Sequence, residues 1–251
     1  MPQPSPPALL APVPRTSTAV LLAKVAAWRG LDVVAVPPER GERDLHWYGG
    51  PLAAARVTGR LGVGLLEPHD DWLSTLPYEL TRRRIELTTL AEAWQLQAPA
   101  FVKPPSDKSV PAAVYADGTR LPKDGDRIGP ETPVLVSEVV EFAAEYRLFV
   151  LDGQVRTGSR YAVHGRLDPA PLDPAARDFA GELLRQSAHT LPSAVVVDTG
   201  RLDDGRWAVV EANMPWFAQS YAAEPGHVLD VVLRASGPRA RISAHDRAFL
   251  R

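Results

Sequence analysis

Two neighbouring segments decide the fold: AVVVDTG at residues 194–200 and RWAVVEANMPW at residues 206–216. Both are rich in β-branched and aromatic residues, and the polar turn between them contains Gly205, a pattern that predicts a β-hairpin. Glu211 and Asn213 are two positions apart, so on a strand they point to the same face. Asp198 lies at or just beyond the end of the first strand, where it could face the same pocket.

These three side chains would offer a bound ion only oxygen atoms. Two carboxylates and an amide oxygen suit Mg²⁺, especially when the ion also holds substrate phosphates. A carboxylate at a strand end is usually just solvated. Glu211, however, follows the apolar run 208–210, and a carboxylate that extends a buried strand needs a partner. The sequence therefore predicts a Mg²⁺ site at Asp198, Glu211 and Asn213.

The hairpin resembles the metal-binding end of the ATP-grasp fold, the family of D-alanine–D-alanine ligase, glutathione synthetase and biotin carboxylase. The resemblance rests on an Asp, a hairpin and then the pattern apolar-apolar-Glu-x-Asn-x-Pro. Asp198 and Glu211 are 13 positions apart, which agrees with the family spacing. The resemblance extends from about residue 101 to residue 216, and it implies that ATP is held between two antiparallel sheets.

Composition limits the other possibilities. The chain has 251 residues, enough for one large or two small domains. Its net charge of −2 gives no electrostatic argument for a nucleic acid or a membrane as partner. The absence of cysteine excludes disulfides, thiolate zinc sites and a cysteine nucleophile. No apolar run is long enough to span a bilayer, and we expect a soluble, cytoplasmic protein.

Local patterns predict an α/β (α+β) chain with a small N-terminal α/β domain at residues 15–97 and an ATP-grasp domain at residues 98–236. Residues 1–14 are rich in proline and are expected to form a disordered tail, and residues 237–251 are expected to form a polar tail. Within the first domain, the spacing of apolar residues predicts an amphipathic helix over residues 80–96. The arginines at 82–84 would form its solvated side, or one of them would reach a phosphate or a carboxylate.

Two lysines are candidates for contacts with phosphate. Residues 100–104 read Ala-Phe-Val-Lys-Pro, an apolar strand that ends in Lys103. A buried stem with its ammonium in a cleft would make a fixed phosphate contact, although surface solvation is the simpler alternative. The segment resembles the ATP-grasp strand whose lysine contacts nucleotide phosphates. Lys108 follows in a loop without glycine, where many family members have a glycine-rich lid, and it would supply a phosphate contact in place of that lid.

The resemblance also implies a hinge that binds the base and the sugar. The backbone of Glu138, Val139 and Val140 would hydrogen-bond adenine, and a glutamate seven positions after Glu138, which is Glu145, would bind the ribose hydroxyls. Glu141 is the competing ribose ligand if the hinge lies three residues earlier.

Two arginines are candidates for stabilising negative charge during the reaction. Arg147 shares a strand face with Glu145, so the two could form a simple ion pair of little value. As part of a nucleotide site, Arg147 would instead bind a β- or γ-phosphate or an oxyanion, and Arg160 could do the same from the neighbouring strand. The position two before Asp198, often arginine in carboxylate–amine ligases, is Val196, which leaves this task to these two.

The family resemblance implies an ATP- and Mg²⁺-dependent carboxylate–amine ligase that forms an amide or peptide bond through an acyl phosphate. Its substrates would be the carboxylate and amine groups of small molecules, amino acids or peptides. An ATP-grasp phosphotransferase that acts on a hydroxyl and a nucleotide-binding regulatory protein without turnover remain as alternatives.

Overall fold

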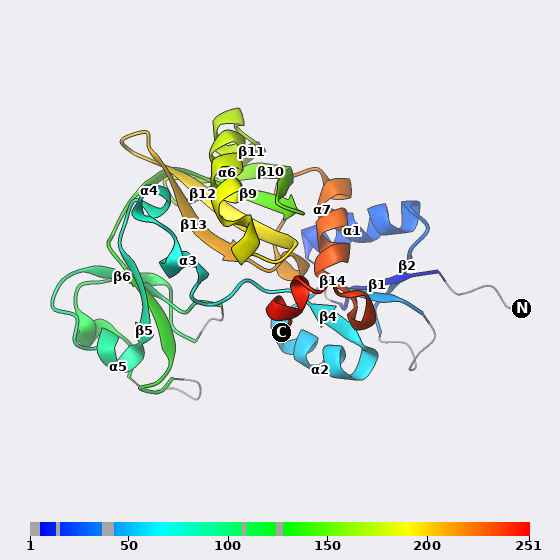
Figure 1. The fold of residues 1–251 in the computed structure, drawn as a ribbon, viewed down its shortest axis with the longest axis horizontal. Coiled ribbons are helices and arrows are strands. Elements are labelled where there is room, and N and C mark those ends of the chain that lie inside the picture. Colours follow the sequence, from blue (N-terminus) through cyan, green and yellow to red (C-terminus); the bar gives the residue numbers. More distant parts are fainter. Residues whose placement is uncertain (1–5, 14–15, 37–42, 107–108, 124–127) are drawn as a thin grey trace, which may run out of the picture.

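The computed structural model describes residues 6–13, 16–36, 43–106, 109–123 and 128–251. A five-stranded antiparallel sheet lies at the centre of the molecule. A three-stranded parallel sheet from the N-terminal part of the chain lies on one side of it, and a four-stranded antiparallel sheet lies on the other side (Figure 1). This mixture of helices and antiparallel sheets confirms the predicted α+β class.

The N-terminal sheet has β1 (Ala8–Leu10) between β2 (Asp32–Val34) and β3 (Leu45–Trp47), and both neighbours run parallel to it. Every residue of β1 is buried, as expected for a central strand whose two faces are both covered. The prediction that residues 1–14 form a disordered tail is therefore wrong for this strand. A short apolar run among prolines can still form a strand when its neighbours supply the pairing.

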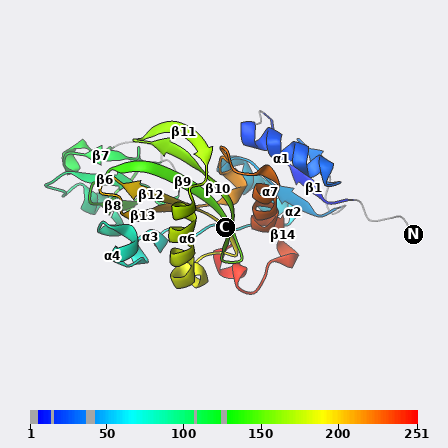
Figure 2. The same cartoon turned by 90° about the horizontal axis from the view of Figure 1, so that it is seen from above.

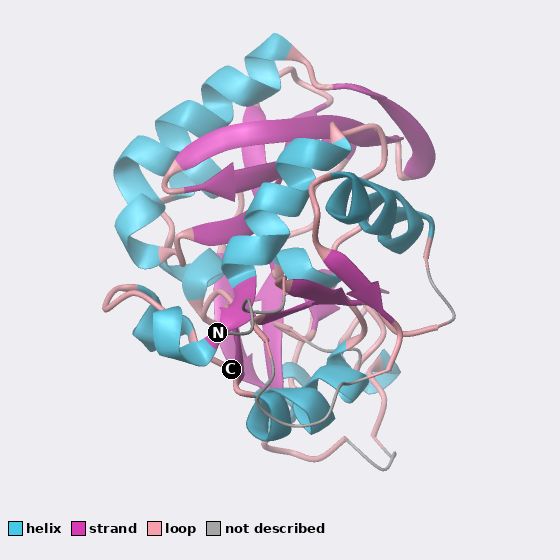
Figure 3. Cartoon of the chain, turned by 90° about the vertical axis from the view of Figure 1, so that its right-hand side faces the viewer, coloured by secondary structure: helices cyan, strands magenta, loops and turns pink. Residues whose placement is uncertain are grey.

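Three helices pack around this sheet, as Figure 3 shows from the N-terminal side. They are α1 (Ser17–Trp28), α2 (Pro51–Leu61) and α7 (Pro225–Ala235). The Thr16 side chain accepts a hydrogen bond from the Ala19 amide and caps α1, as the sequence predicts. Proline is the first residue of both α2 and α7, where its missing N–H costs nothing.

The C-terminal segment returns to the same layer. β14 (Ser236–Pro238) pairs antiparallel with β4 (Val63–Leu65), and both Asp246 and Phe249 are buried. The Asp246 carboxylate accepts hydrogen bonds from the backbone and hydroxyl groups of Ser193. The prediction of a polar tail over residues 237–251 is therefore wrong, because this segment supplies packing and caps to the folded chain.

Leu9→Ala is expected to lower the free energy of unfolding by about 2–5 kcal/mol, because truncating a fully buried leucine leaves a cavity. Leu9 has no exposed surface in the middle of β1. Urea unfolding followed by circular dichroism would measure the loss. The matched control is Val13→Ala, since Val13 is 71% exposed and its truncation should change little. Equal stability of the two variants would show that residues 8–10 do not belong to the folded core.

The central sheet has the strand order β11-β10-β9-β12-β13. Its strands are β9 (Phe142–Leu151), β10 (Gln154–Val163), β11 (Arg166–Pro171), β12 (Ala194–Leu202) and β13 (Trp207–Asn213). The predicted hairpin forms from β12 and β13, with Asp198 opposite Glu211 and Val196 opposite Asn213. It lies at one side of the sheet, and β13 is the edge strand.

The two faces of this sheet have different partners. α6 (Pro174–Ser187) packs along one face (Figure 2) and contacts Ala144, Tyr146 and Leu148 of β9. The side chains between them, among them Glu145 and Arg147, point to the opposite face. That face is covered by α7 near the N-terminal sheet, and farther along β9 it faces the four-stranded sheet.

The four-stranded sheet has the order β5-β8-β6-β7. Its strands are β5 (Ile85–Thr89), β6 (Ala100–Lys103), β7 (Ala113–Tyr115) and β8 (Pro133–Ser137). Two short helices, α3 (Trp72–Thr75) and α4 (Tyr78–Thr81), connect it to the N-terminal layer. α5 (Leu90–Ala93) follows β5 directly.

The predicted helix over residues 80–96 is wrong, because β5 occupies its centre. Arg82 has a φ of +54° and ends α4 in the left-handed conformation. Thr89 then caps α5 in a reciprocal capping box with Glu92. The boundary predicted between residues 97 and 98 is also misplaced, because β5 pairs along its whole length with β8 of the following module.

None of the helices in the described ranges is both long and apolar enough to cross a membrane.

Candidate active site

A pocket of about 300 Å³ opens between the four-stranded and five-stranded sheets, a volume within the usual range for small-molecule sites. Lys103 and Glu211 lie at one end, and Glu138, Val139 and Val140 lie along its wall. The structure thus places the predicted phosphate contact and the predicted hinge on the same pocket, one from each sheet. Further polar lining residues are Arg83, Ser137, Glu145 and Tyr161.

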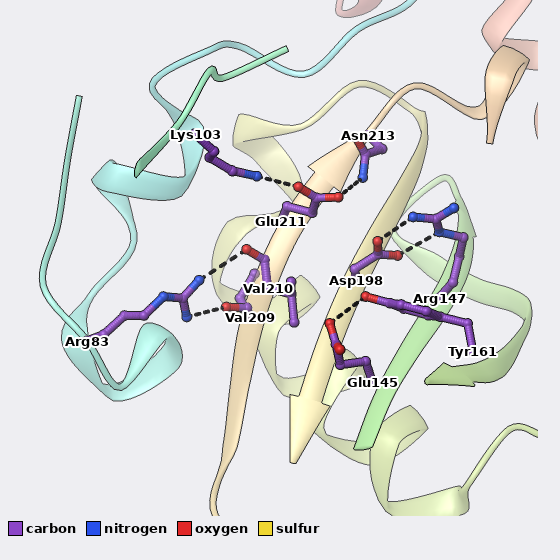
Figure 4. A network of polar contacts seen from close by, with 10 residues as sticks. All are labelled: Arg83, Lys103, Glu145, Arg147, Tyr161, Asp198, Val209, Val210, Glu211 and Asn213. Carbon is purple, nitrogen blue, oxygen red and sulfur yellow. Dashed lines mark hydrogen bonds and ion pairs between the residues drawn. The ribbon is translucent and has the colours of Figure 1, made fainter. Parts of the chain in front are cut away.

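Lys103 bridges the two sheets at this pocket (Figure 4). It is the last residue of β6, and its ammonium donates a hydrogen bond to the Glu211 carboxylate on β13. The other Glu211 oxygen accepts a hydrogen bond from Asn213 Nδ2 at 2.6 Å. Burial alone would raise the pKa of Glu211, but the charge of Lys103 and these two hydrogen bonds hold that pKa below its ordinary value. Glu211 is therefore a carboxylate at neutral pH.

Asp198 is held by Arg147 from the adjacent strand. Arg147 Nε donates to Asp198 Oδ1 at 2.9 Å and Arg147 Nη2 donates to Asp198 Oδ2 at 2.6 Å (Figure 4). Asp198 is completely buried, and burial raises its pKa while Arg147 opposes that rise. In turn, burial would lower the pKa of Arg147, but the Asp198 carboxylate more than offsets this and raises it. The sequence predicts both residues at the site but not their pairing.

Glu145 lines the same pocket on β9. Its carboxylate accepts a hydrogen bond from the Tyr161 hydroxyl at 2.7 Å. Burial raises the pKa of Glu145, and the nearby Asp198 and Glu211 charges add to the rise. The competing candidate, Glu141, is exposed and is not one of the pocket-lining residues. The structure therefore favours Glu145 as the ribose ligand.

Two tyrosines that the sequence patterns do not single out enclose Arg147. The rings of Tyr161 and Tyr221 are stacked with centroids 5.3 Å apart. The Arg147 guanidinium carbon lies 5.4 Å from the first ring and 5.5 Å from the second, distances at which a cation is attracted to an aromatic face. Tyr221 has a φ of +49°, unusual for a residue other than glycine. No sequence pattern links residues 147, 161 and 221.

Two other predicted residues are not at the pocket. Arg160 pairs with Asp168 of β11 at 2.9 Å. Its register partner is Tyr146, which faces α6, so Arg160 lies on the face of the sheet away from the pocket. The prediction that Arg160 assists the reaction is therefore not supported by its position. Lys108 lies outside the described residues.

Arg83 is a further candidate functional residue, and its position corrects an expectation from the sequence. The expected solvated face at residues 82–84 is wrong for Arg83, which is only 7% exposed and lines the pocket beside Glu211. Its guanidinium donates hydrogen bonds to the carbonyls of Val209 and Val210 (Figure 4). An arginine run in a segment with helical spacing gives no sign of such burial.

The donor groups at the hairpin fit Mg²⁺. Asp198, Glu211 and Asn213 come from paired positions of β12 and β13 that point into the cleft, and they offer only oxygen as metal ligands. In the part of the chain that the structure describes, no group of three or more His, Cys, Asp or Glu side chains is placed to hold an ion. Two carboxylates and one amide make an incomplete set, which suits an ion that is completed by substrate phosphates and water.

Comparisons agree with this geometry. A family model that describes an ATP-grasp domain, the second family of its clade, matches residues 80–231. No curated protein matches the chain. Among solved structures, a RimK domain ATP-grasp protein from Sphaerobacter thermophilus DSM 20745 has a TM-score of 0.56 and 19% identity, covering 91% of this chain and 99% of that one.

Two further structures share the fold at low identity. D-cycloserine synthetase DcsG has a TM-score of 0.57 and 15% identity, and the alignment covers 90% of this chain and 98% of that chain. The ATP-grasp ligase PsnB, complexed with the precursor peptide PsnA2 and AMPPNP, has a TM-score of 0.50 and 13% identity over 93% of this chain and 98% of that chain.

The family match covers well over half of the chain and begins at α4, so it includes both sheets that enclose the pocket. It confirms the predicted family and supports the predicted ATP-dependent ligase and its use of ATP. The chain belongs to the ATP-grasp family, and within it to the second family of the clade that the model describes.

Proposed function

We propose that this protein is an ATP- and Mg²⁺-dependent ligase that joins a carboxylate to an amine through an acyl phosphate. The observation that carries the proposal is the contact between Lys103 and Glu211 at one end of a pocket whose wall is the hinge segment 138–140. A nucleotide in this pocket would have its base at the hinge and its phosphates at the contact between the sheets.

Each side chain has a task in this arrangement. The backbone of residues 138–140 would bind adenine, and Glu145 would bind the ribose. Lys103 would move its hydrogen bond from Glu211 to a phosphate oxygen. Glu211, Asn213 and Asp198 would hold Mg²⁺, which when bound neutralises phosphate charge and fixes the geometry of transfer.

The reaction itself needs positioning more than a protein nucleophile. The substrate carboxylate attacks the γ-phosphorus, and ADP leaves. The amine then attacks the acyl carbon, phosphate leaves, and the nitrogen loses a proton. Arg147 lies beside Asp198, where its remaining N–H groups would stabilise the negative charge that develops on the transferred group.

The named relatives support the substrate class. PsnB is an ATP-grasp ligase complexed with a precursor peptide, and DcsG is a synthetase of D-cycloserine. Peptides, amino acids and similar small molecules are therefore the acceptors to test first. We also propose that the protein acts in the cytoplasm, where ATP is available.

Calorimetric titration with AMPPNP, with and without Mg²⁺, tests the nucleotide half of the proposal. Micromolar binding that Mg²⁺ strengthens would support it, and no binding in either condition would contradict it. Incubation with ATP, candidate carboxylates and hydroxylamine tests the chemistry. A hydroxamate product would identify an acyl phosphate, whereas a stable phosphorylated alcohol without hydroxamate would favour the phosphotransferase alternative.

Lys103→Met is expected to weaken AMPPNP binding by about 10- to 100-fold, because a charge-assisted hydrogen bond contributes about 1.5–3 kcal/mol. The smaller thermal shift on adding nucleotide would report the same loss. Lys24→Met is the matched control, since Lys24 is exposed on α1. Equal affinities of the two variants would show that Lys103 does not contact the nucleotide.

A further inference from the structure

The strand that carries Glu211 contains a β-bulge directly before it. Val209 lies opposite Thr199 and Glu211 lies opposite Asp198, so Val210 is an extra residue between two adjacent pairs. Val209 packs against the core beneath α6, and so does Ala212. In a regular strand, residues three positions apart point to opposite faces. The bulge is the reason that both can face α6.

The bulge decides where the metal ligands point. If β13 continued from Val209 without an extra residue, Glu211 would lie opposite Val197, which faces the apolar core under α6. A slip of one residue moves every later side chain to the other face. With the bulge, Glu211 and Asn213 both point into the cleft, opposite Asp198 and Val196.

Arg83 binds the backbone at this bulge. Its Nη1 donates to the Val209 carbonyl at 2.8 Å and its Nη2 donates to the Val210 carbonyl at 3.1 Å. Nη1 also donates to the carbonyl of Thr81 at the end of α4, at 2.9 Å. One planar guanidinium thus joins the segment before β5 to two successive carbonyls of the edge strand.

The surroundings keep Arg83 fixed and charged. Its guanidinium carbon lies 5.6 Å from the centre of the Phe142 ring. Burial lowers the pKa of Arg83 to about 10, and the Glu211 charge opposes that fall, so the side chain remains a cation at neutral pH. A lysine would keep the charge but could not present two parallel donors to two carbonyls.

We propose that Arg83 is a positioning residue that holds the bulge at Val210 and thereby directs Glu211 into the cleft. The inference rests on the proposed function, because it assigns to Glu211 the task of holding Mg²⁺ with the nucleotide. Arg83 itself acts through the backbone of β13. It also fixes that strand to the segment that leads into the four-stranded sheet, which carries Lys103.

The test compares Arg83→Lys and Arg83→Met with wild type by two measurements. The first is hydrogen exchange of residues 207–214 without nucleotide, followed by mass spectrometry. The second is the ratio of AMPPNP dissociation constants without and with Mg²⁺. We expect faster exchange confined to residues 207–214 and a fall of about tenfold or more in that ratio. Affinity in the absence of Mg²⁺ should change much less. Arg185→Met, in an exposed pair on α6, is the matched control.

A merely structural role predicts a different result, in which exchange rises throughout the chain while the Mg²⁺ ratio of the folded protein is unchanged. That result, or unchanged exchange at residues 207–214, would overturn the inference. If wild type binds AMPPNP without any effect of Mg²⁺, the proposed function fails in its metal half. The inference then fails with respect to Mg²⁺, and the exchange measurement still decides whether Arg83 holds the bulge.

Discussion

Glu211→Gln is expected to abolish Mg²⁺-dependent ATP turnover while leaving the protein folded. Glu211 is a carboxylate at neutral pH and points into the cleft beside Asn213. Loss of a residue that merely orients a metal ligand commonly costs about 10- to 100-fold in affinity or activity, so loss of a ligand should exceed that. Steady-state ADP release at saturating ATP, titrated with Mg²⁺, would measure the effect.

The same variant separates metal binding from nucleotide binding. In wild type, Lys103 donates to Glu211, so nucleotide phosphates compete with a protein carboxylate for the same ammonium. The neutral glutamine would release Lys103, and AMPPNP binding without Mg²⁺ should therefore be unchanged or tighter. Asn213→Ala should lose turnover in the same way, and Glu182→Gln on the exposed surface of α6 is the matched control. Normal Mg²⁺-dependent turnover in both site variants would refute the metal assignment.

Most of the pocket is predictable from the sequence because its residues lie on regular strands. The hairpin of β12 and β13 and the Lys103 strand each have an apolar run and a clear end, and the structure has all of them. The family spacing predicts Glu145, and it lines the pocket. What these segments share is that local periodicity alone sets which side chains face the cleft.

The parts that sequence patterns do not predict depend on contacts between distant segments. The apolar residues of β5 fit a helix as well as a strand, and only pairing with β8 decides between the two. β1 is an apolar run of three residues among prolines, and two parallel neighbours stabilise it. The burial of Arg83 depends on two carbonyls of Val209 and Val210 more than a hundred positions away. No local pattern contains that information.

Arg147→Met is expected to destabilise the protein by about 3–5 kcal/mol, because it leaves a fully buried carboxylate without its partner. Asp198 has no exposed surface, and both of its oxygens accept hydrogen bonds from Arg147. Arg160→Met is the matched control on the neighbouring strand, since the pair that Arg160 forms with Asp168 is partly exposed. Pairs of that kind contribute at most about 1 kcal/mol. Urea unfolding of both variants would measure the difference.

The pH dependence of this loss identifies its cause. Without Arg147, nothing opposes the rise that burial causes in the pKa of Asp198, so the folded variant keeps a proton that the unfolded chain has lost. Stability of the variant should therefore fall as pH rises above the ordinary carboxyl pKa of about 4, and the deficit should be larger at about pH 8 than at about pH 5. Arg147→Met/Asp198→Asn should remove most of this pH dependence, because the double variant has no buried charge. A deficit of equal size at both pH values, or one no larger than that of Arg160→Met, would mean that the bidentate pair does not fix the charge of Asp198.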